Sequence, residues 1–400
     1  MPLNHSSPTI ETEERERLLR ILAGITFLIF FQAYMVAPMI PRLSAAFGVS
    51  EQKIGLLIPA YLIPYGVSTL FFGLLSDWMG RRRIMLASLA AFAALTGLTA
   101  TSASANQMIL WRLLTGLGAS GVVPLALALI GTFFPLKERG RPLGWLFGAM
   151  AGGMAFGSTF GVMLEPVIGW RGVFLAVSAC GFLSLMLLRP YLALLGERSA
   201  TKTFSLDAVM TGYHQLLSVP RAQRTYFYVF MNAVFHSGVF TWLGLYFSRR
   251  YGLGEIGIGI ALLGYGVPGF VLGPLIGSAA DRWGRRWLVP VGIGLAALSA
   301  FLLVPASPLA VAAVTVTLLS LGYDMTQPLL AGIVTALDPK RAGQAMGLNV
   351  FALFTGFGLG SLLFGWALQL GFPMALLIFG GVQGTAGLAA IAVFRSEQRV

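Results

Sequence analysis

The stretch that decides the fold is Gly73–Arg83, GLLSDWMGRRR, and a second version of it, GSAADRWGRRW, follows 204 positions later at Gly277–Trp287. The two stretches share two glycines, an aspartate and two arginines in register. The same displacement carries Tyr61, Pro64, Pro124, Phe147, Gly152, Phe160 and Gly161 onto Tyr265, Pro268, Pro328, Phe351, Gly356, Phe364 and Gly365. The chain is therefore two tandem copies of one half.

The composition of the chain indicates whether water or lipid surrounds the folded protein. Apolar residues make up 56% of the chain and charged residues only 10%, whereas a soluble domain carries about a quarter of charged residues. Such a surface must face lipid. The long apolar runs lack the alternation of a barrel strand, so helices are expected. The single cysteine, Cys180, excludes an intrachain disulfide.

Twelve segments have the length of about 20 apolar residues that crosses a bilayer. They lie near 20–41, 54–76, 83–104, 107–133, 142–166, 172–190, 224–248, 255–279, 286–305, 307–334, 342–369 and 371–394. This predicts an all-α membrane protein with twelve transmembrane helices in two pseudo-symmetric six-helix bundles, 20–190 and 224–394. Residues 1–19 form an amino-terminal arm that lacks the features of a signal peptide, 191–223 a linker and 395–400 a tail. A tandem repeat of membrane segments is typical of secondary transporters.

The basic residues predict the orientation. With the amino terminus inside, the segments on the cytosolic side hold 21 Lys and Arg and those outside hold 5, while Arg112 lies within a span. We therefore expect a multi-pass protein of the cell membrane with both termini cytosolic. Because the basic groups are spread over alternate loops, the net charge of +12 does not indicate nucleic-acid binding.

With these features in place, the chain resembles the major facilitator superfamily, in the twelve-helix branch of drug and proton antiporters. Gly73, Leu75, Asp77, Gly80, Arg81 and Arg82 match its best-known motif. The resemblance covers roughly residues 20 to 395. The residues of the motif themselves predict a conformational latch at the cytosolic face, because the aspartate can hold the positive end of a neighbouring helix and the arginines can pair with carboxylates or lipid phosphate. The latch would comprise Gly73, Asp77, Gly80, Arg81, Arg82, Gly277, Asp281, Gly284, Arg285 and Arg286. The alternative is that the arginines only anchor the topology.

Two further patterns resemble this branch, and one departs from it. Arg112 with Gly116, Gly118 and Ala119 resembles the span-four arginine pattern, and Pro38 with Pro41 resembles the paired prolines that end span one. In span five the family's Gly-Pro pair is replaced by the stretch 157–161, GSTFG, which lacks the proline. The glycines at 144, 148, 152, 157 and 161 still form a small-residue face, and the resemblance implies that this face packs against span eight.

Three ionisable residues lie at membrane depth, where each is a functional hypothesis by default. Asp324 is near the middle of span ten. Pro328 has no backbone N–H to donate to the carbonyl of Asp324, four residues earlier, so a helix kink is expected at this acidic residue. His236 lies near the midpoint of span seven, and Arg112 lies in the outer part of span four. The three are candidates for proton coupling and substrate binding. The alternatives are a neutral Asp324 and a His236 that hold helices together, and an Arg112 that snorkels.

Other polar and aromatic residues suit the lining of a central cavity for an amphipathic organic molecule. They are Gln32, Tyr34, Asn232, Trp242, Tyr265, Tyr323, Gln327 and Asn349. Helix packing is the alternative for each of them, and about half are expected to face the cavity.

These features predict a monomeric secondary transporter that exports an amphipathic drug, metabolite or siderophore-like compound by proton antiport. Its partners would be a small-molecule substrate, protons and membrane lipid. Two alternatives stay open: proton symport of a small organic anion with Arg112 as the anion site, and a membrane sensor or assembly partner without flux. The sequence shows no phosphate loop, zinc spacing or Ser-His-Asp set, so no enzyme activity, cofactor or metal is expected.

Overall fold

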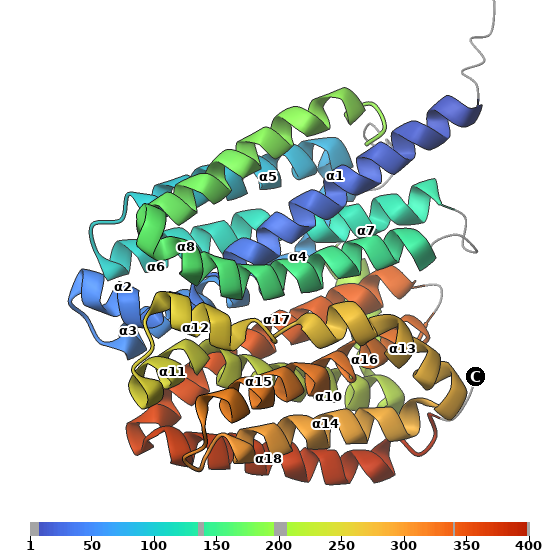
Figure 1. Cartoon of the computed structure of the whole chain (residues 1–400). Helices are drawn as coiled ribbons and strands as arrows, with labels where there is room; N and C mark the ends of the chain where they lie inside the picture. The colour runs from blue at the N-terminus through green and yellow to red at the C-terminus, as the bar shows by residue number, and fades with distance from the viewer. Residues whose placement is uncertain (1–7, 135–139, 196–205, 339–340, 398–400) are drawn as a thin grey trace, which may run out of the picture.

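The computed structural model of the chain describes residues 8–134, 140–195, 206–338 and 341–397, and Figure 1 shows their arrangement. Helices and turns account for these residues, with no strand among them. The helices form two bundles that lie side by side, one running from blue to green and the other from yellow to red. The predicted all-α fold with two six-helix bundles is confirmed.

The first bundle begins with a long tilted helix and ends with a helical hairpin. Its elements are α1 (Pro8–Tyr34), η1 (Ala37–Met39), α2 (Ile40–Phe47), α3 (Glu51–Gly55), α4 (Leu57–Met79), α5 (Arg81–Ala100), α6 (Ala105–Ala119), α7 (Val122–Phe133), α8 (Gly140–Leu188) and η3 (Arg189–Tyr191). The linker contributes α9 (Leu206–Leu217). Two helices lie within α8, because Gly169 at φ 69° and ψ 159° leaves the helical conformation and reverses the course of the chain between spans five and six.

The second bundle repeats this plan with more interruptions. Its elements are α10 (Pro220–Thr241), α11 (Leu243–Tyr251), α12 (Glu255–Leu262), α13 (Val267–Trp283), α14 (Arg285–Leu302), α15 (Leu309–Asp324), α16 (Gln327–Thr335), α17 (Ala342–Ala367), η5 (Leu368–Leu370) and α18 (Phe372–Val393). Nine helical segments of the described residues are long and apolar enough to cross a membrane, and α8 supplies two predicted spans within one of them. Spans seven and eight fall outside the nine, and each is divided into two helices.

The repeated motif forms the same turn in both bundles. Gly80 joins α4 to α5 at φ 93° and ψ 136°, and Gly284 joins α13 to α14 at φ 80° and ψ 158°. A side chain would strain this left-handed backbone, which explains why both copies use glycine. In each copy, arginines begin the next helix directly after the turn.

Helix breaks near the middle of spans four and ten follow from the repeated prolines. The helix break between α6 and α7 precedes Pro124, and the break between α15 and α16 precedes Pro328. The last residue of α15 is Asp324, as expected from the donor that Pro328 lacks. Span eight is also divided: α12 ends at Leu262, and α13 starts after Gly266. Gly266 has a φ of 80°, which is not helical.

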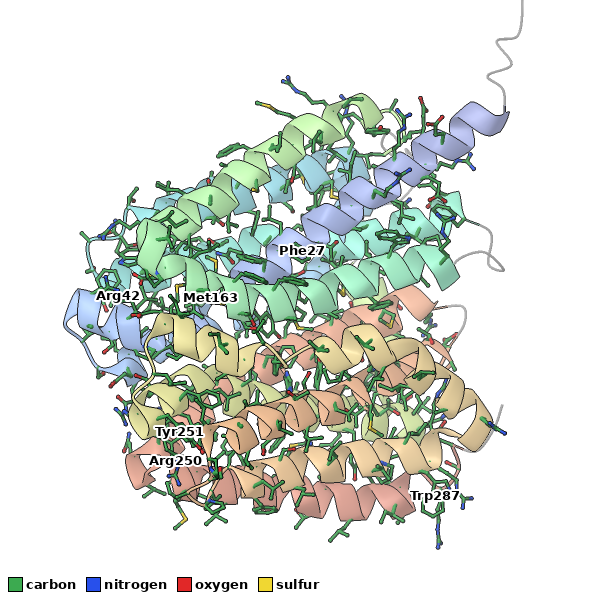
Figure 2. The ribbon with its side chains drawn as sticks, in the orientation of Figure 1. Phe27, Arg42, Met163, Arg250, Tyr251 and Trp287 are labelled. Carbon is green, nitrogen blue, oxygen red and sulfur yellow. The ribbon has the colours of Figure 1, made fainter. Side chains whose placement is uncertain are left out.

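The bundles contact each other at the end of the molecule that lies away from the termini. We call the end with the start of α1 and the carboxyl terminus the terminal end, and the end with α2, α3 and α11 the distal end (Figure 1). At the distal end Gly244 of α11 lies against Pro38, and Gly259 of α12 lies against Met163, which Figure 2 labels. An ion pair of 3.2 Å joins Arg249 to Glu51 across the same seam.

The small-residue face of span five packs differently from the expectation. A Cβ atom at Gly153, Gly157 or Gly161 would collide with α1 or with the residue that follows it. The prediction that this face packs against span eight was therefore wrong. Span five does contact span eight, but the glycines at that seam, Gly259 and Gly266, belong to span eight and receive larger side chains from α8.

Candidate functional site

An aromatic cluster surrounds His236 of α10. The imidazole of His236 stacks on the Tyr323 ring with 3.9 Å between centroids, and its Nε2 forms a hydrogen bond with the Tyr265 hydroxyl. Phe240 and Phe357 complete the surroundings, with centroids 6.2 and 5.9 Å from the imidazole. The histidine is buried, and its Nδ1 has no hydrogen-bond partner among the described residues.

The cluster continues across the seam into the first bundle. The ring centroid of Tyr34, at the end of α1, lies 5.7 Å from that of Phe240. The same ring meets Phe357 edge-on, with 6.3 Å between the centroids. Tyr65 of α4 stacks on Phe354 of α17 at 4.4 Å. The hydroxyl groups of Tyr34 and Tyr65 are buried and lack partners within the described part of the chain. An aromatic surface with unused hydrogen-bonding groups thus lies between the bundles.

Arg112 is fully buried and is held by backbone carbonyls of the first bundle. Its Nε donates to the Leu57 carbonyl at 3.2 Å, and its Nη2 donates to the Ala33 carbonyl at 3.3 Å. Its Nη1 donates to the side-chain oxygen of Gln32 at 2.8 Å and to the carbonyl of the same residue at 3.3 Å. The guanidinium also lies 4.3 Å from the centre of the Tyr61 ring. It therefore ties the end of α1 to the start of α4.

Asp324 lies where two interrupted spans meet. Its carboxylate accepts a hydrogen bond from the Ser320 hydroxyl at 3.0 Å and another from the backbone N–H of Gly269. The Ser320 hydroxyl in turn accepts from the backbone N–H of Gly266 at 2.9 Å. Because α13 begins at Val267, the carboxylate faces the positive end of a half-helix. No positively charged side chain of the described residues pairs with it.

A polar network supports the break that follows Asp324. The Asn232 amide donates to the Thr326 hydroxyl at 2.8 Å, and the Gln383 amide donates to the Asn232 oxygen at 3.0 Å. Thr326 donates to the carbonyls of Gly322 and Tyr323, the last residues before Asp324. Asn232 therefore lies in a satisfied network that stabilises the bend in span ten.

Two predicted cavity residues keep unused polar atoms. Both amide atoms of Gln327 and the oxygen of Asn349 are buried without a partner in the regions the structure describes. Trp242 is different, because it lies in the distal seam against Gly55 and Gly365 and donates its indole N–H to the Ser361 carbonyl at 3.0 Å. Its place is the contact between the bundles, away from the cluster around His236.

The described parts of the predicted latch connect neighbouring helices. Arg81 donates to the Thr132 hydroxyl of α7 at 2.9 Å, and in the second copy Arg285 lies beside Gly332 of α16. Gly80 and Gly284 form the turns. Arg82, another predicted latch residue, is exposed. The side-chain surroundings of four more lie outside the described residues: Gly73, Asp77, Gly277 and Asp281.

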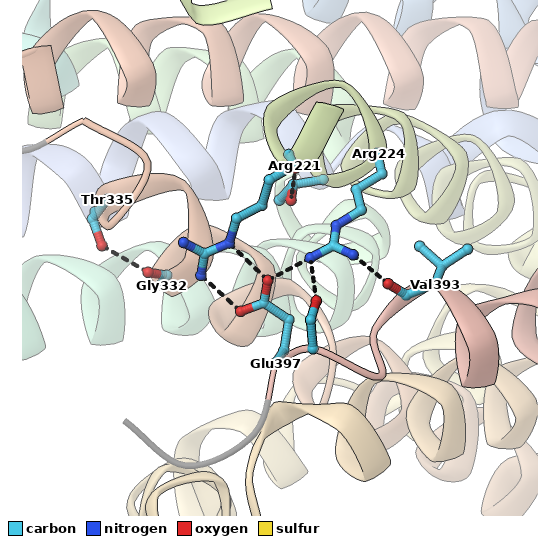
Figure 3. A network of polar contacts seen from close by, with 8 residues as sticks. Arg221, Arg224, Gly332, Thr335, Val393 and Glu397 are labelled. Atoms are coloured by element: carbon cyan, nitrogen blue, oxygen red, sulfur yellow. Dashed lines mark hydrogen bonds and ion pairs between the residues drawn. The ribbon is translucent and has the colours of Figure 1, made fainter. Parts of the chain in front are cut away.

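An ion-pair network at the terminal end was not anticipated. Figure 3 shows Glu397 between Arg221 and Arg224. Arg221 donates from Nε and Nη2 to the two carboxylate oxygens at 2.8 Å each, and Arg224 donates at 2.7 Å. The backbone N–H of Arg286 donates to the Glu397 carbonyl. The hydrogen bonds from Arg221 hold the pKa of Glu397 below its ordinary value. The network joins the ends of α10, α14 and α18.

Sequence reasoning missed several residues that the fold brings to the site. Phe240, Phe354 and Phe357 contact predicted residues but are common core types, so only their position at the seam distinguishes them. Ser320 precedes Asp324 by one helical turn, and that spacing was a usable signal. Glu397 belongs to residues 395–400, which the sequence predicts to be a tail.

Comparison with known proteins agrees with this architecture. The sequence profile of the Major Facilitator Superfamily matches residues 22–262 and 225–400. The uncharacterized MFS-type transporter YceJ of Bacillus subtilis is 26% identical over 372 residues, covering 92% of both chains. Multidrug resistance protein 1 of the same organism is 22% identical over 348 residues, covering 86% of this chain and 88% of its own.

A solved structure shares the fold along nearly the whole chain. The bacterial homolog of the human lysosomal transporter Spinster, in an inward-facing and occupied conformation, matches with a TM-score of 0.76 and 17% identity, over 96% of this chain and 98% of its own. At this identity the likeness concerns the fold alone. Together with the family profile, it shows that this chain is a membrane transporter of the Major Facilitator Superfamily.

Proposed function

We propose that this protein exports an amphipathic small organic molecule across the cell membrane in exchange for protons. The terminal end faces the cytosol, as the excess of basic residues on that side supports. The two bundles, working as a monomer, open alternately to either side of a central site. The similarity to Multidrug resistance protein 1 supports export as the direction.

The surroundings of Asp324 are the observation that supports proton coupling. The Asp324 carboxylate lies within a membrane span and has no cationic partner among the described side chains. Its hydrogen bonds come from Ser320 and from the terminus of a half-helix. A carboxylate with a paired cation would stay ionised, whereas this one exchanges a proton at a modest electrostatic cost. Protonation removes the charge that faces α13, so the proton state acts on the break in span eight.

The aromatic cluster supports an aromatic or amphipathic substrate. Rings of both bundles meet there, and the unused groups of Tyr34, Tyr65 and His236 offer hydrogen bonds that the protein itself leaves unmade. Stacking and a few directed polar contacts are the usual means of binding such molecules. Gln327 and Asn349 supply further unused groups in span ten and span eleven.

The bonding of Arg112 favours export over uptake of a small organic anion. That alternative uses Arg112 as the anion site. In this conformation the guanidinium already donates to the carbonyls of Gln32, Ala33 and Leu57 and to the Gln32 amide, so an anion would have to displace these acceptors. Each lost bond to a buried charged group costs about 1.5–3 kcal/mol.

The decisive experiment is transport by purified protein in liposomes with an imposed pH gradient. A thermal-shift screen of drugs, siderophores, sugars and amino acids first identifies a substrate. We expect substrate movement opposite to proton movement, and loss of the coupled proton flux in Asp324→Asn with substrate binding retained. The matched control is Asp207→Asn, an exposed aspartate of the linker helix.

Other outcomes of this experiment separate the alternatives. Proton and substrate movement in the same direction would establish symport and overturn export. Binding of a compound without flux under any gradient would indicate a sensor. Undiminished proton coupling in Asp324→Asn would show that the proton site lies elsewhere.

A further inference from the structure

A groove of about 620 Å³ lies between α1 and the first part of α8 at the terminal end. Arg20 and Arg141 lie at its mouth, and Gly24, Gly144 and Gly148 are among the residues that line it. In Figure 1 the two helices run side by side and diverge toward this end. Neither the transport site nor the predicted latch includes any of these residues.

The groove exists because the glycines at this end are not used for packing. A Cβ atom at Gly24, Gly144 or Gly148 would meet no atom of the described residues within 4 Å, in contrast to the closely packed glycines farther along α8. The small side chains therefore leave a channel between the helices. An acyl chain is the apolar occupant that the bilayer offers for such a space.

The groove lies on a side of the molecule that faces lipid. Phe27, which also lines it, packs 6.0 Å from Phe156, and Phe156 stacks on Phe160 at 5.4 Å. Phe156 and Phe160 are both exposed large hydrophobic side chains. Figure 2 places Phe27 on the face of the bundle that is turned toward the viewer, at the surface of α1. A lipid can therefore enter from the side.

The mouth of the groove is basic and held in place. Glu16 accepts from Arg141 Nη2 at 2.8 Å through its carboxylate and from Arg20 Nε at 3.4 Å through its backbone carbonyl. Two guanidinium groups and one carboxylate leave a net positive charge. The Arg141 side chain is 68% exposed, so most of its N–H groups remain available. Trp145, half exposed beside them, has the amphipathic ring that is enriched at the level of lipid headgroups.

We propose that this groove binds one anionic phospholipid of the leaflet at the terminal end. The phosphate accepts hydrogen bonds from Arg20 and Arg141, and an acyl chain lies along Gly24, Gly144 and Gly148. Guanidinium groups suit this role because they offer paired donors to phosphate oxygens. The proposal does not depend on what the protein transports. If the terminal end is cytosolic, the ligand comes from the leaflet that holds most anionic lipid.

The test is a titration of the full-length protein with phosphatidylglycerol and phosphatidylcholine of identical acyl chains, followed by native mass spectrometry. We expect one phosphatidylglycerol to bind about tenfold more tightly than phosphatidylcholine, because the choline ammonium offsets the phosphate charge that the two guanidinium groups attract. The combined change Arg20→Gln and Arg141→Gln removes this preference. Arg395→Gln, an exposed arginine at the same end of the other bundle, retains it.

A second variant tests the groove independently of its charge. Gly148→Leu fills the channel and should weaken phosphatidylglycerol binding about tenfold while the melting temperature is maintained. Gly381→Leu is the matched control, since Gly381 also has nothing within 4 Å of an added Cβ but lies on α18.

Three results would overturn the proposal. The first is equal binding of the two lipids by the unaltered protein. The second is displacement of phosphatidylglycerol by inorganic phosphate alone, which would indicate a simple anion site. The third is displacement by the transported compound with no effect of the arginine changes, which would make the groove an entry path for substrate.

Discussion

At the scale of single residues, Arg112 shows how a buried charge is accommodated with no counter-ion among the described residues. Its four hydrogen-bond contacts go to oxygen atoms of Gln32, Ala33 and Leu57, and the face of Tyr61 lies over the guanidinium. Carbonyl dipoles and an aromatic face replace water at moderate cost, whereas an unpaired buried charge would be prohibitive. The position of Arg112 within an apolar span identified it as a buried charge, but the sequence did not show which oxygen atoms accept its hydrogen bonds.

Glu397 gives a prediction for stability against pH. Because Arg221 and Arg224 hold its pKa below the unfolded value of about 4.3, the network stabilises the fold fully above that value and loses its effect as the pH falls through the folded pKa. We expect Glu397→Gln to lower the free energy of unfolding by about 1.5–3 kcal/mol at pH 7. Melting curves in detergent from pH 7 to pH 3 measure this.

The same curves contain their own control. The difference between Glu397→Gln and the unaltered protein should shrink as the pH falls through the lowered folded pKa of Glu397, since the glutamate becomes neutral there too. Glu14→Gln, an exposed glutamate of α1, should show no difference at any pH. A deficit in Glu397→Gln that persists unchanged to pH 3 would contradict an ionic role for Glu397.

At the scale of elements, the broken spans bring residues of the candidate site together. Span ten bends after Asp324 and span eight restarts at Val267, so the end of α15 meets the beginning of α13. Thr317, Ser320 and Asp324 lie on one face of α15 and contact the Gly264, Gly266 and Gly269 backbone respectively. Half-helix termini at mid-membrane are typical sites for charge in transporters.

This contact predicts the effect of a single methyl group. A Cβ atom at Gly269 would lie 2.7 Å from the Asp324 Oδ1 atom, so Gly269→Ala must displace the carboxylate from the start of α13. We expect coupled proton flux to fall about tenfold, the equivalent of one hydrogen bond to a charged group. Gly294→Ala, where the added atom meets nothing within 4 Å, is the control. Equal flux in both variants would contradict the role of this contact.

At the scale of the whole molecule, the bundles are closely joined at the distal end. Gly244 receives Pro38, Gly55 receives Trp242, and Glu51 pairs with Arg249. Glycines in one bundle opposite bulky groups in the other allow close contact, and separating the bundles there breaks the partly exposed ion pair between Glu51 and Arg249, a kind of pair that contributes little to stability. Alternating access requires such a seam, because the closed side must also open.

Cross-linking across the seam should therefore stop transport. In a Cys180→Ser background, Glu51→Cys and Arg249→Cys joined by a reducible bismaleimide should abolish substrate flux, and reduction should restore it. The control is Glu13→Cys with Arg17→Cys, which places the same linker within α1 on an exposed ion pair. Transport that continues with the seam linked would mean that the distal end stays closed throughout the cycle.

The sequence by itself determined the number of spans, the two copies and their turns, because hydrophobic length, prolines and positive-φ glycines act locally. It also identified Asp324, His236 and Arg112, since charge at membrane depth is visible in one dimension. Only the tertiary structure decided their partners. The carbonyls around Arg112, the half-helix that faces Asp324 and the rings around His236 come from distant segments, and packing between bundles places them there. Residue types alone carry no information about which distant surfaces meet.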